Sequence, residues 1–250
     1  MNTFLLMVQL FTKIPINKEI EFDKENFRKG VLYFPLVGLI VGLLTAFMAY
    51  VLNYIFSREI TVMLSIFFSI ALTGALHWDG LADTMDGVLS ARKREQMLII
   101  MKDSRIGTHG VLSLVLFVIL KFLFLIELND ELLLPVIFVL PVVGKTAIAL
   151  MLWGSQYARK EGLGDLFIGK SRPRDSIGAG VISLVIIYLV LGVKGILALI
   201  FVILISLFIR RKLNRILGGM TGDTLGAINE ISELLFIPLL ILMEKVGALL

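Results

Sequence analysis

Long apolar runs dominate this sequence, and charged side chains are concentrated in the short stretches between them. Hydrophobic residues make up 58% of the 250 residues, whereas Asp, Glu, Lys and Arg together make up only 18%. A water-soluble domain of this length has no interior large enough to bury so much apolar sequence. Several runs are instead long enough to cross the ~30 Å hydrocarbon core of a bilayer. The sequence therefore predicts an all-α fold, a polytopic helical bundle embedded in the lipid bilayer.

About seven membrane-spanning helices are expected. The sixth is short for a full crossing unless Lys194 and Arg210 snorkel to the interfaces. The opening segment, residues 1–11, is too short to span and is expected to be a helix at the membrane interface. Gly38 and Gly42 have the Gly-xxx-Gly spacing that lets a second helix approach closely. The expected spans are residues 31–57, 60–76, 106–128, 132–153, 177–193, 196–209 and 234–250.

The distribution of Lys and Arg predicts the orientation of the bundle. Nineteen of the 24 basic residues fall in the N-terminal segment and three long loops, residues 1–30, 77–106, 154–176 and 210–233. Basic residues are retained on the cytoplasmic side, so the N-terminus and these loops are expected in the cytoplasm. The same bias accounts for the net charge of +4 without a nucleic-acid partner. No repeat, linker or cleavable signal pattern is evident, so residues 1–250 are expected to form one membrane-embedded domain.

Three aspartates follow the second expected span. On a helix, Asp83 lies about 40° to one side of Asp79, and Asp86 lies about 20° to the other. Carboxylates on one narrow stripe repel one another unless a cation lies among them, and oxygen ligands favour Mg²⁺, with Mn²⁺ as an alternative. We interpret the three as metal ligands and catalytic candidates; the alternative is a solvated helix end capped by Asp79. The neighbouring His77 is a candidate base, ligand or orienting group.

A basic segment precedes the third expected span. Lys102, Ser104 and Arg105, with the glycine amides that follow, are the groups that commonly bind phosphate. Asp103 lies between the two cations, which indicates a specific ion pair or a further metal ligand. The alternative interpretation is a basic anchor that holds this end of the span in the cytoplasm.

Two further cations are candidates for binding a phosphate group. Lys145 lies within the fourth expected span, about 12 Å deeper than Trp153, and should face the bundle interior or a wet cavity. Snorkelling of its long side chain to the interface is the alternative. Arg159 follows that span in a polar loop, shortly before a pair of closely spaced glycines, Gly162 and Gly164.

A second acidic segment lies before the seventh expected span. Thr221 and its neighbouring glycines could form a turn whose amides bind an anion. Asp223 and Glu230 are seven residues apart, on one face of a helix, and are candidates for a second metal site. Taken alone, Asp223 would be interpreted as a helix N-cap.

Acidic clusters beside cations at a membrane surface favour metal-dependent phosphoryl or phosphodiester transfer. The aspartate spacing is also similar to that of membrane CDP-alcohol phosphotransferases, but Asp83 stands where that signature has arginine, and its second half is missing. A transporter that couples cations or protons to substrate movement is a third alternative. Against the transporter, the carboxylates cluster at the end of one span and no repeated half is present.

Four blocks of the sequence stand out in order: His77–Gly87, Met101–Gly107, Ala158–Arg159 with Gly162–Gly164, and Gly219–Ala227. Together they resemble the cobalamin synthase family of adenosylcobinamide-GDP ribazoletransferases. The segments Thr12–Ile16 and Phe34–Gly38 are similar to that family's N-terminal pattern. Trp78, Met85 and Asn17 depart from the expected residues, and Lys145 stands where arginine is commoner.

The resemblance implies a reaction and its partners. A ribose hydroxyl of α-ribazole, or of α-ribazole 5′-phosphate, would attack the pyrophosphate of adenosylcobinamide-GDP, and GMP would leave with the assistance of Mg²⁺. It also implies a multi-pass protein of a cell inner membrane, with its active site on the cytoplasmic side. On this hypothesis Lys102, Arg105 and Arg159 bind the pyrophosphate, and Asp223 and Glu230 complete a second metal or ribose site.

Overall fold

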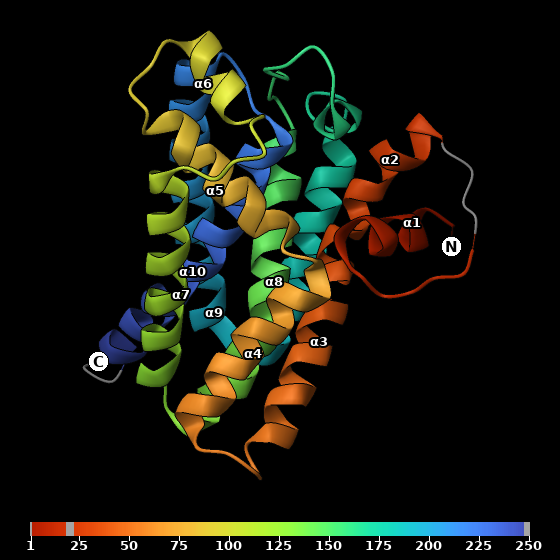
Figure 1. The fold of residues 1–250 in the computed structure, drawn as a ribbon. Coiled ribbons are helices and arrows are strands. Elements are labelled where there is room, and N and C mark those ends of the chain that lie inside the picture. The colour runs from red at the N-terminus through yellow and green to blue at the C-terminus, as the bar shows by residue number, and fades with distance from the viewer. Residues whose placement is uncertain (1, 19–22, 248–250) are drawn as a thin grey trace.

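The computed structural model describes residues 2–18 and 23–247, and in this part of the chain it is a bundle of helices (Figure 1). The only β-type pairing among these residues is one isolated bridge between Tyr157 and Met220. The predicted all-α fold is confirmed. The α-helices are α1 (Asn2–Phe11), α2 (Lys24–Gly30), α3 (Phe34–Leu52), α4 (Arg58–Thr73), α5 (Leu76–Val88), α6 (Arg94–Ile100), α7 (Thr108–Glu127), α8 (Asp130–Leu152), α9 (Pro173–Leu217) and α10 (Gly222–Gly247), with 3-10 turns η1 (Val31–Tyr33) and η2 (Leu163–Leu166).

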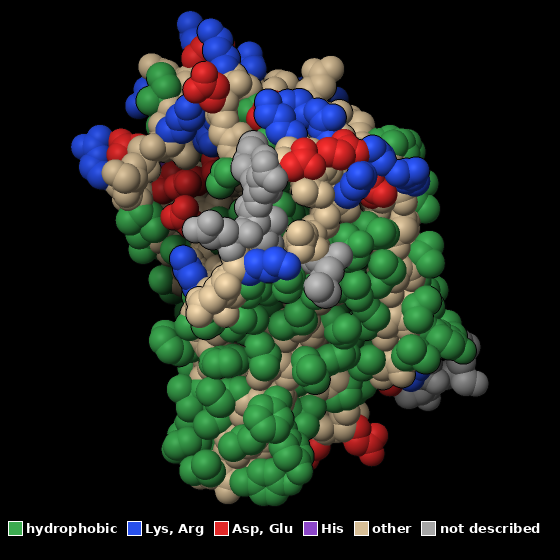
Figure 2. Space-filling view, turned by 90° about the vertical axis from the view of Figure 1, so that its right-hand side faces the viewer, with side chains coloured by type: hydrophobic (Ala, Val, Ile, Leu, Met, Phe, Trp, Pro, Cys, Tyr) green, Lys and Arg blue, Asp and Glu red, His purple; other side chains and the backbone are tan. Residues whose placement is uncertain are grey.

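Several helices are long and apolar enough to cross a bilayer. Among the described residues there are five of them, or six if the bent pair α4 and α5 forms one broken span. The surface agrees with a membrane location, because hydrophobic side chains cover the lower part of the molecule in Figure 2. Charged side chains gather at the upper end, which we call the polar end. The predicted class, a helical bundle with several membrane-spanning helices, is therefore confirmed.

Helix α9 is interrupted and contains more than one crossing length. Its 45 residues would extend about 68 Å if straight, roughly twice the hydrocarbon thickness. The chain reverses at Gly192, whose φ of 62° and ψ of −154° are not helical. Beyond this break Lys194 pairs with Glu244 at 2.7 Å, whereas Arg210 donates to the Trp153 carbonyl at 2.7 Å. The two arms correspond to the expected fifth and sixth spans, and a total of seven crossings stays a prediction.

The glycine spacing in the first span marks a close helix contact, as predicted. A Cβ on Gly38 would lie 2.5 Å from the Pro141 carbonyl oxygen, and one on Gly42 would lie 1.9 Å from that of Phe138. Only a residue without a side chain lets α3 approach α8 so closely. Helix α8 also packs against α9 and α10, so it lies at the centre of the bundle and most of its residues are buried.

The second span ends in a sharp bend. Gly74 and Ala75 both have positive φ values, 62° and 57°, so the helix cannot continue through them. Helices α4 and α5 consequently meet at 91°. Helix α5, which carries the aspartates, crosses the bundle at the polar end and packs against α10 (Figure 1).

The expected start of the seventh span was wrong. The polar segment 210–233 is mostly helical: α9 continues to Leu217, and α10 begins at Gly222. Hydropathy missed this because the polar residues Asn229, Glu230 and Glu233 face the bundle interior and are buried there. The last residues of the expected span, 248–250, lie outside the described part.

The short N-terminal helix α1 is present, but it is not merely a surface element. Its Met7 side chain is fully buried, and Val8 and Phe11 are nearly so. These side chains pack into a core at the polar end that includes Phe34 of α3 and Phe167. Helix α1 thus forms part of the wall of the site described next, and its position relative to the membrane surface stays a prediction.

Candidate active site

The site is built where α5 crosses α10. A Cβ on Gly80 would lie 2.7 Å from the backbone oxygen of Asp223. One on Gly226 would lie 3.1 Å from the backbone oxygen of His77. The two glycines let the helix backbones touch, and this contact brings the carboxylates of α5 beside that of Asp223.

Three of the predicted carboxylates share this crossing. The Asp83 carboxylate is repelled by those of Asp79 and Asp223, and more weakly by that of Asp86. The guanidinium of Arg159 offsets part of this repulsion. One cation thus faces several anions, so the crossing carries excess negative charge at the edge of a pocket.

A short backbone pairing positions Arg159. The Ala158 N–H donates to the Met220 carbonyl at 2.9 Å, and the Met220 N–H donates to the Gln156 carbonyl at 2.8 Å. This pairing joins the loop after α8 to the start of α10. Arg159 Nη2 then donates to Asp223 Oδ2 at 2.6 Å and to the Met101 carbonyl at 3.3 Å.

Thr221, not Asp223, caps α10. The Thr224 N–H donates to Thr221 Oγ1 at 3.2 Å, and the Thr221 N–H donates to Thr224 Oγ1 at 2.8 Å. This reciprocal pairing is a capping box. Thr221 is fully buried, and the structure gives it this structural role. The Asp223 carboxylate is consequently free to pair with Arg159.

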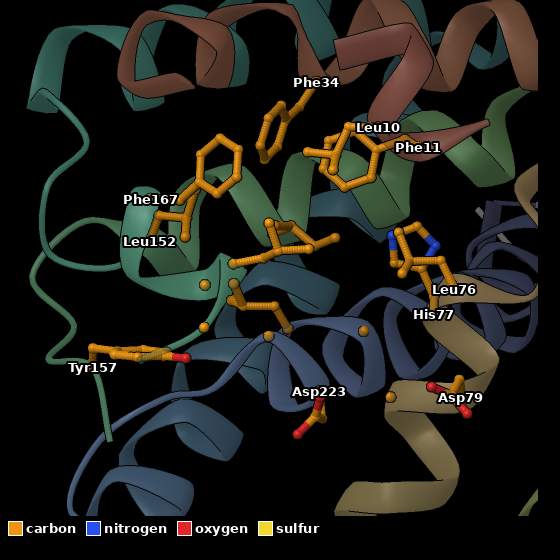
Figure 3. Close-up of a pocket in the computed structure, with 18 of the residues that line it drawn as sticks. Leu10, Phe11, Phe34, Leu76, His77, Asp79, Leu152, Tyr157, Phe167 and Asp223 are labelled. Atoms are coloured by element: carbon orange, nitrogen blue, oxygen red, sulfur yellow. The ribbon is translucent and has the colours of Figure 1, made fainter. Parts of the chain in front are cut away.

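A pocket of about 290 Å³ opens beside the crossing, and its two sides differ in chemistry (Figure 3). Asp79, Asp223 and Arg159 line one side, together with Tyr157. Burial raises the pKa of the Tyr157 phenol, so it stays protonated and neutral. The opposite side is apolar and consists of Leu10, Phe11, Phe34, Leu152 and Phe167.

Asp86 faces away from this pocket. It is 8% exposed, and its two carboxylate oxygens accept the Gly107 N–H at 2.7 Å and the Gly110 N–H at 2.8 Å. These amides belong to the start of α7, where the helix dipole favours a negative charge. A capping role is the alternative interpretation for Asp79. The structure instead gives such a role to Asp86, which caps the start of α7 rather than an end of its own helix.

The predicted basic segment is at the surface. Lys102, Ser104 and Arg105 are exposed and do not line the pocket. Asp103 and Arg105 form the expected ion pair at 2.7 Å, which lowers the pKa of Asp103 to about 2. The segment is linked to the site only through the Met101 carbonyl, which Arg159 contacts.

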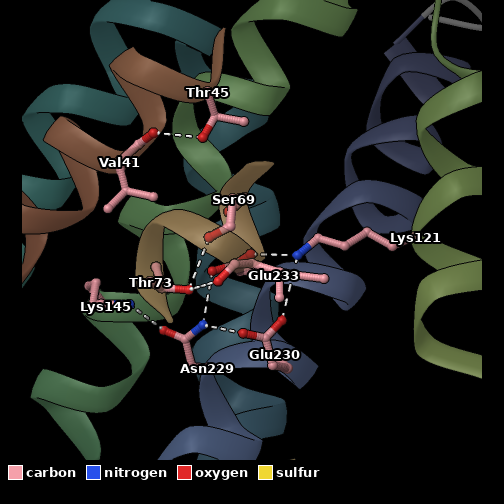
Figure 4. Close-up of polar contacts among 10 residues, drawn as sticks. Val41, Thr45, Ser69, Thr73, Lys121, Lys145, Asn229, Glu230 and Glu233 are labelled. Carbon is pink, nitrogen blue, oxygen red and sulfur yellow. Dashed lines mark hydrogen bonds and ion pairs between the residues drawn. The ribbon is translucent and has the colours of Figure 1, made fainter. Parts of the chain in front are cut away.

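Lys145 and Glu230 belong to a second polar cluster, deeper in the bundle (Figure 4). Lys145 Nζ donates to Asn229 Oδ1 at 3.0 Å, and Asn229 Nδ2 donates to Glu230 Oε1 at 3.1 Å and Glu233 Oε1 at 2.9 Å. Lys121 Nζ lies 2.7 Å from Glu233 and 3.6 Å from Glu230. Lys145 faces the interior as predicted. The two lysines balance the two glutamates, so this cluster has little charge left for a metal.

His77 lies between the two polar regions. It is 3% exposed, its ring stacks on that of Phe11 at 5.7 Å, and it lines both the main pocket and a small cavity beside Lys145. Its Nε2 atom has no hydrogen-bond partner among the described residues. An unpaired buried nitrogen is available to a bound ligand or water.

The structure does not gather the five predicted metal ligands into one group. Among the described residues, no three His, Cys, Asp or Glu side chains are arranged to hold a metal ion. Asp86 and Glu230 have the other partners described above. Asp79, Asp83 and Asp223 nevertheless offer only oxygen donors, and in the described part of the chain Arg159 is the one cation that offsets their mutual repulsion, so this donor set fits Mg²⁺.

Sequence patterns did not reveal every residue of these two regions. The aromatic wall is assembled from α1, α3 and the loop after α8, and no local motif connects them. The sequence could have indicated Lys121 and Glu233. Each is a charged residue inside an apolar helix, and charged residues in such positions usually pair with one another.

Comparisons with known proteins identify the family. The family model described as cobalamin-5-phosphate synthase matches residues 3–241. An adenosylcobinamide-GDP ribazoletransferase of Clostridium novyi (strain NT) is 42% identical over 250 residues, 100% of both chains. Proteins of the same name from Thermoanaerobacter sp. (strain X514) and Clostridium botulinum (strain Loch Maree / Type A3) are 41% and 37% identical, covering 92% and 97% of this chain and 93% and 98% of theirs. No solved structure matches this chain. The chain belongs to the cobalamin-5-phosphate synthase family.

Proposed function

We propose that this protein is an adenosylcobinamide-GDP ribazoletransferase. It joins the cobinamide-phosphate part of adenosylcobinamide-GDP to a ribose hydroxyl of α-ribazole or its 5′-phosphate, and GMP is released. The observation that carries this proposal is that Asp79, Asp223 and Arg159 line one edge of a pocket and that all three interact with the carboxylate of Asp83. The family membership and the names of the relatives support the same reaction.

The chemistry is a displacement at phosphorus. The ribose oxygen forms a new bond to the phosphorus that carries the cobinamide, and the bond from that phosphorus to the oxygen of GMP breaks. Asp79 and His77 both line the pocket, and we assign the role of accepting the hydroxyl proton to one of them, because Asp223 is paired with Arg159. Arg159, oriented by Asp223, stabilises the charge that develops on the phosphate oxygens.

A divalent cation fits this mechanism. Asp79 and Asp83 are one helical turn apart and, with Asp223, would hold Mg²⁺, with Mn²⁺ as an alternative. The bound cation would neutralise pyrophosphate oxygens. Arg105 and Lys102 are exposed, in the segment whose Met101 carbonyl accepts from Arg159, and are proposed to bind the parts of the donor that remain outside the pocket.

The proposal includes location and extent. The positive-inside distribution of Lys and Arg supports an inner membrane protein whose polar end, with the site, faces the cytoplasm. Residues 1–250 are proposed to act as one catalytic domain, because the pocket is lined by segments from both ends of the chain: α1, α3, α5, α8, the loop after α8, and α10.

Product analysis tests the proposal. Purified protein in detergent is incubated with Mg²⁺, adenosylcobinamide-GDP and α-ribazole, and GMP and the corrinoid product are measured. We expect GMP release that requires both substrates. No release with either α-ribazole or its 5′-phosphate would contradict the proposal. CMP release from a CDP-alcohol would indicate the phosphotransferase alternative, and substrate flux in proteoliposomes without turnover would indicate a transporter.

A further inference from the structure

The apolar side of the pocket is a rigid aromatic wall. The Phe11 and Phe34 ring centroids lie 4.8 Å apart, and those of Phe34 and Phe167 lie 5.6 Å apart, both in edge-to-face geometry. These three side chains are only 7%, 1% and 6% exposed, so the surrounding core holds them in place. Leu10 and Leu152 complete the wall (Figure 3). Such a surface is suited to a flat, apolar group.

The wall itself offers no polar side-chain atom to a ligand, and among the described residues the one polar group at its edge is His77, whose ring stacks on Phe11. Its five side chains are phenyl or aliphatic groups, whereas the carboxylates and the guanidinium lie on the opposite side of the same pocket. A ligand that fills the pocket must therefore have an apolar, aromatic end and a polar end. A buried polar edge placed against the wall would lose its hydrogen bonds to water without replacement.

The volume of the pocket further limits which part of the two substrates can fill it. About 290 Å³ lies at the lower limit for small-molecule sites and is appropriate to a single nucleoside. A corrin macrocycle with its side chains is several times too large. Guanine carries several polar groups around its edge, and of the residues that the structure describes only His77, through Nε2 beside Phe11, is placed to pair with one of them. The benzimidazole base of α-ribazole is planar, its benzo edge is apolar, and its single acceptor nitrogen needs only one such partner.

We propose that the aromatic wall binds the base of the nucleoside acceptor, so that its ribose is directed to the acidic side of the pocket. This inference rests on the proposed function and assigns the pocket to one of its two substrates. The corrin and the guanosine of the donor then lie outside, and only the pyrophosphate reaches Asp83 and Arg159. The wall consequently selects benzimidazole-type bases over purines.

A substrate-specific kinetic comparison tests the inference. Phe167→Leu keeps the position apolar but removes the ring face, and we expect the KM for α-ribazole to rise about tenfold with the KM for adenosylcobinamide-GDP unchanged. Phe47→Leu is the matched control, because Phe47 is on α3 but is 65% exposed, away from the pocket. If Phe167→Leu does not fold, Leu10→Asn provides the same test. Leu10 is only half-buried, and a polar amide at this edge of the wall should raise the KM for α-ribazole in the same way.

Direct binding separates this inference from the proposed function. Titration of α-ribazole into wild-type protein with Mg²⁺ should show binding that Phe167→Leu weakens and that free GDP does not compete with. An α-riboside of adenine should be used at least tenfold less efficiently than α-ribazole. Turnover with an unchanged acceptor KM in the variant, or competition by GDP, would overturn the inference while the function stands. Absence of GMP release with intact α-ribazole binding would overturn the function alone.

Discussion

Arg159 Nη2 lies 2.6 Å from Asp223 Oδ2 and joins the loop after α8 to the first turn of α10. The two side chains are 12% and 22% exposed, so the ion pair is largely shielded from solvent. It exists because Thr221 caps the helix and leaves the aspartate free. The guanidinium is thereby fixed beside Asp83, at the edge of the pocket where charge develops in the proposed reaction.

Substitution of Arg159 should affect the reaction more than the fold. Arg159→Met removes the cation next to the acidic crossing, and we expect kcat to fall by about a hundredfold or more. Arg159→Lys keeps the charge but loses the two-point contact with Asp223 and Met101, and should recover only part of the activity. Steady-state assays with the thermal midpoint measured in parallel check this. Equal activity of the methionine variant and wild type would show that Arg159 is not in the catalytic machinery.

Two aspartates of one helix should behave differently. Asp83→Asn removes a carboxylate that is repelled by its neighbours, so the protein should remain folded and lose turnover. Asp86→Asn places an amide against two N–H donors at the start of α7 and should cost about 1–2 kcal/mol of stability. Thermal unfolding in detergent and turnover, measured on both variants, give the comparison. Near-normal turnover of Asp83→Asn would remove this residue from the metal assignment.

Metal removal should abolish activity reversibly. Treatment with a chelator leaves the acidic crossing with Arg159 as the one cation, among the described residues, that faces Asp79, Asp83 and Asp223. Mg²⁺ or Mn²⁺ should restore GMP release, whereas Ca²⁺ should restore less because it favours more ligands at longer distances. Asp79→Asn should raise the Mg²⁺ concentration required for half-maximal rate. Full activity in the presence of chelator would contradict a metal-dependent mechanism.

The contact between α5 and α10 should tolerate no side chain. A Cβ at Gly80 would meet the Asp223 backbone oxygen at 2.7 Å, so Gly80→Ala must push the two helices apart. We expect at least a tenfold loss of kcat/KM and a lower thermal midpoint. Gly180→Ala is the control, because Gly180 lies in α9, does not line the pocket, and a Cβ there would meet only Leu150 at an ordinary 3.5 Å. Similar effects of the two substitutions would mean that helix spacing at Gly80 is not what positions the acids.

The stability of the protein should depend on the balance of charges in the second polar cluster. Lys121→Met leaves Glu230 and Glu233 with one lysine fewer, and breaking a buried pair in this way costs about 3–5 kcal/mol. Lys121→Met combined with Glu233→Gln removes one charge of each sign and should recover much of that stability. Thermal unfolding in detergent measures both. A double variant as unstable as the single one would show that Lys121 contributes through packing alone.

The sequence predicted the chemistry of single segments correctly where the relevant contacts are local. Hydropathy identified a helical membrane protein, and the spacing of Gly38 and Gly42 predicted a close helix contact that the structure confirms. The i, i+4 and i+7 pattern placed Asp79, Asp83 and Asp86 on one helix, α5. Patterns of this kind depend on residues one or two turns apart, and the helix geometry that relates them is fixed.

Only the tertiary structure decided which of these groups meet. The bend at Gly74 turns α5 across the bundle, so Asp83 faces Asp223 while Asp86 turns to the start of α7. Asp223 and Glu230 share a helix but serve separate clusters, since a rigid helix carries residues two turns apart into different surroundings. The partners of a charged group are set by distances in space, and those depend on backbone reversals and helix contacts far away in the sequence. The sequence by itself thus determined the membrane bundle and the candidate acids, and the packing of α5, α8 and α10 decided which acids form the site.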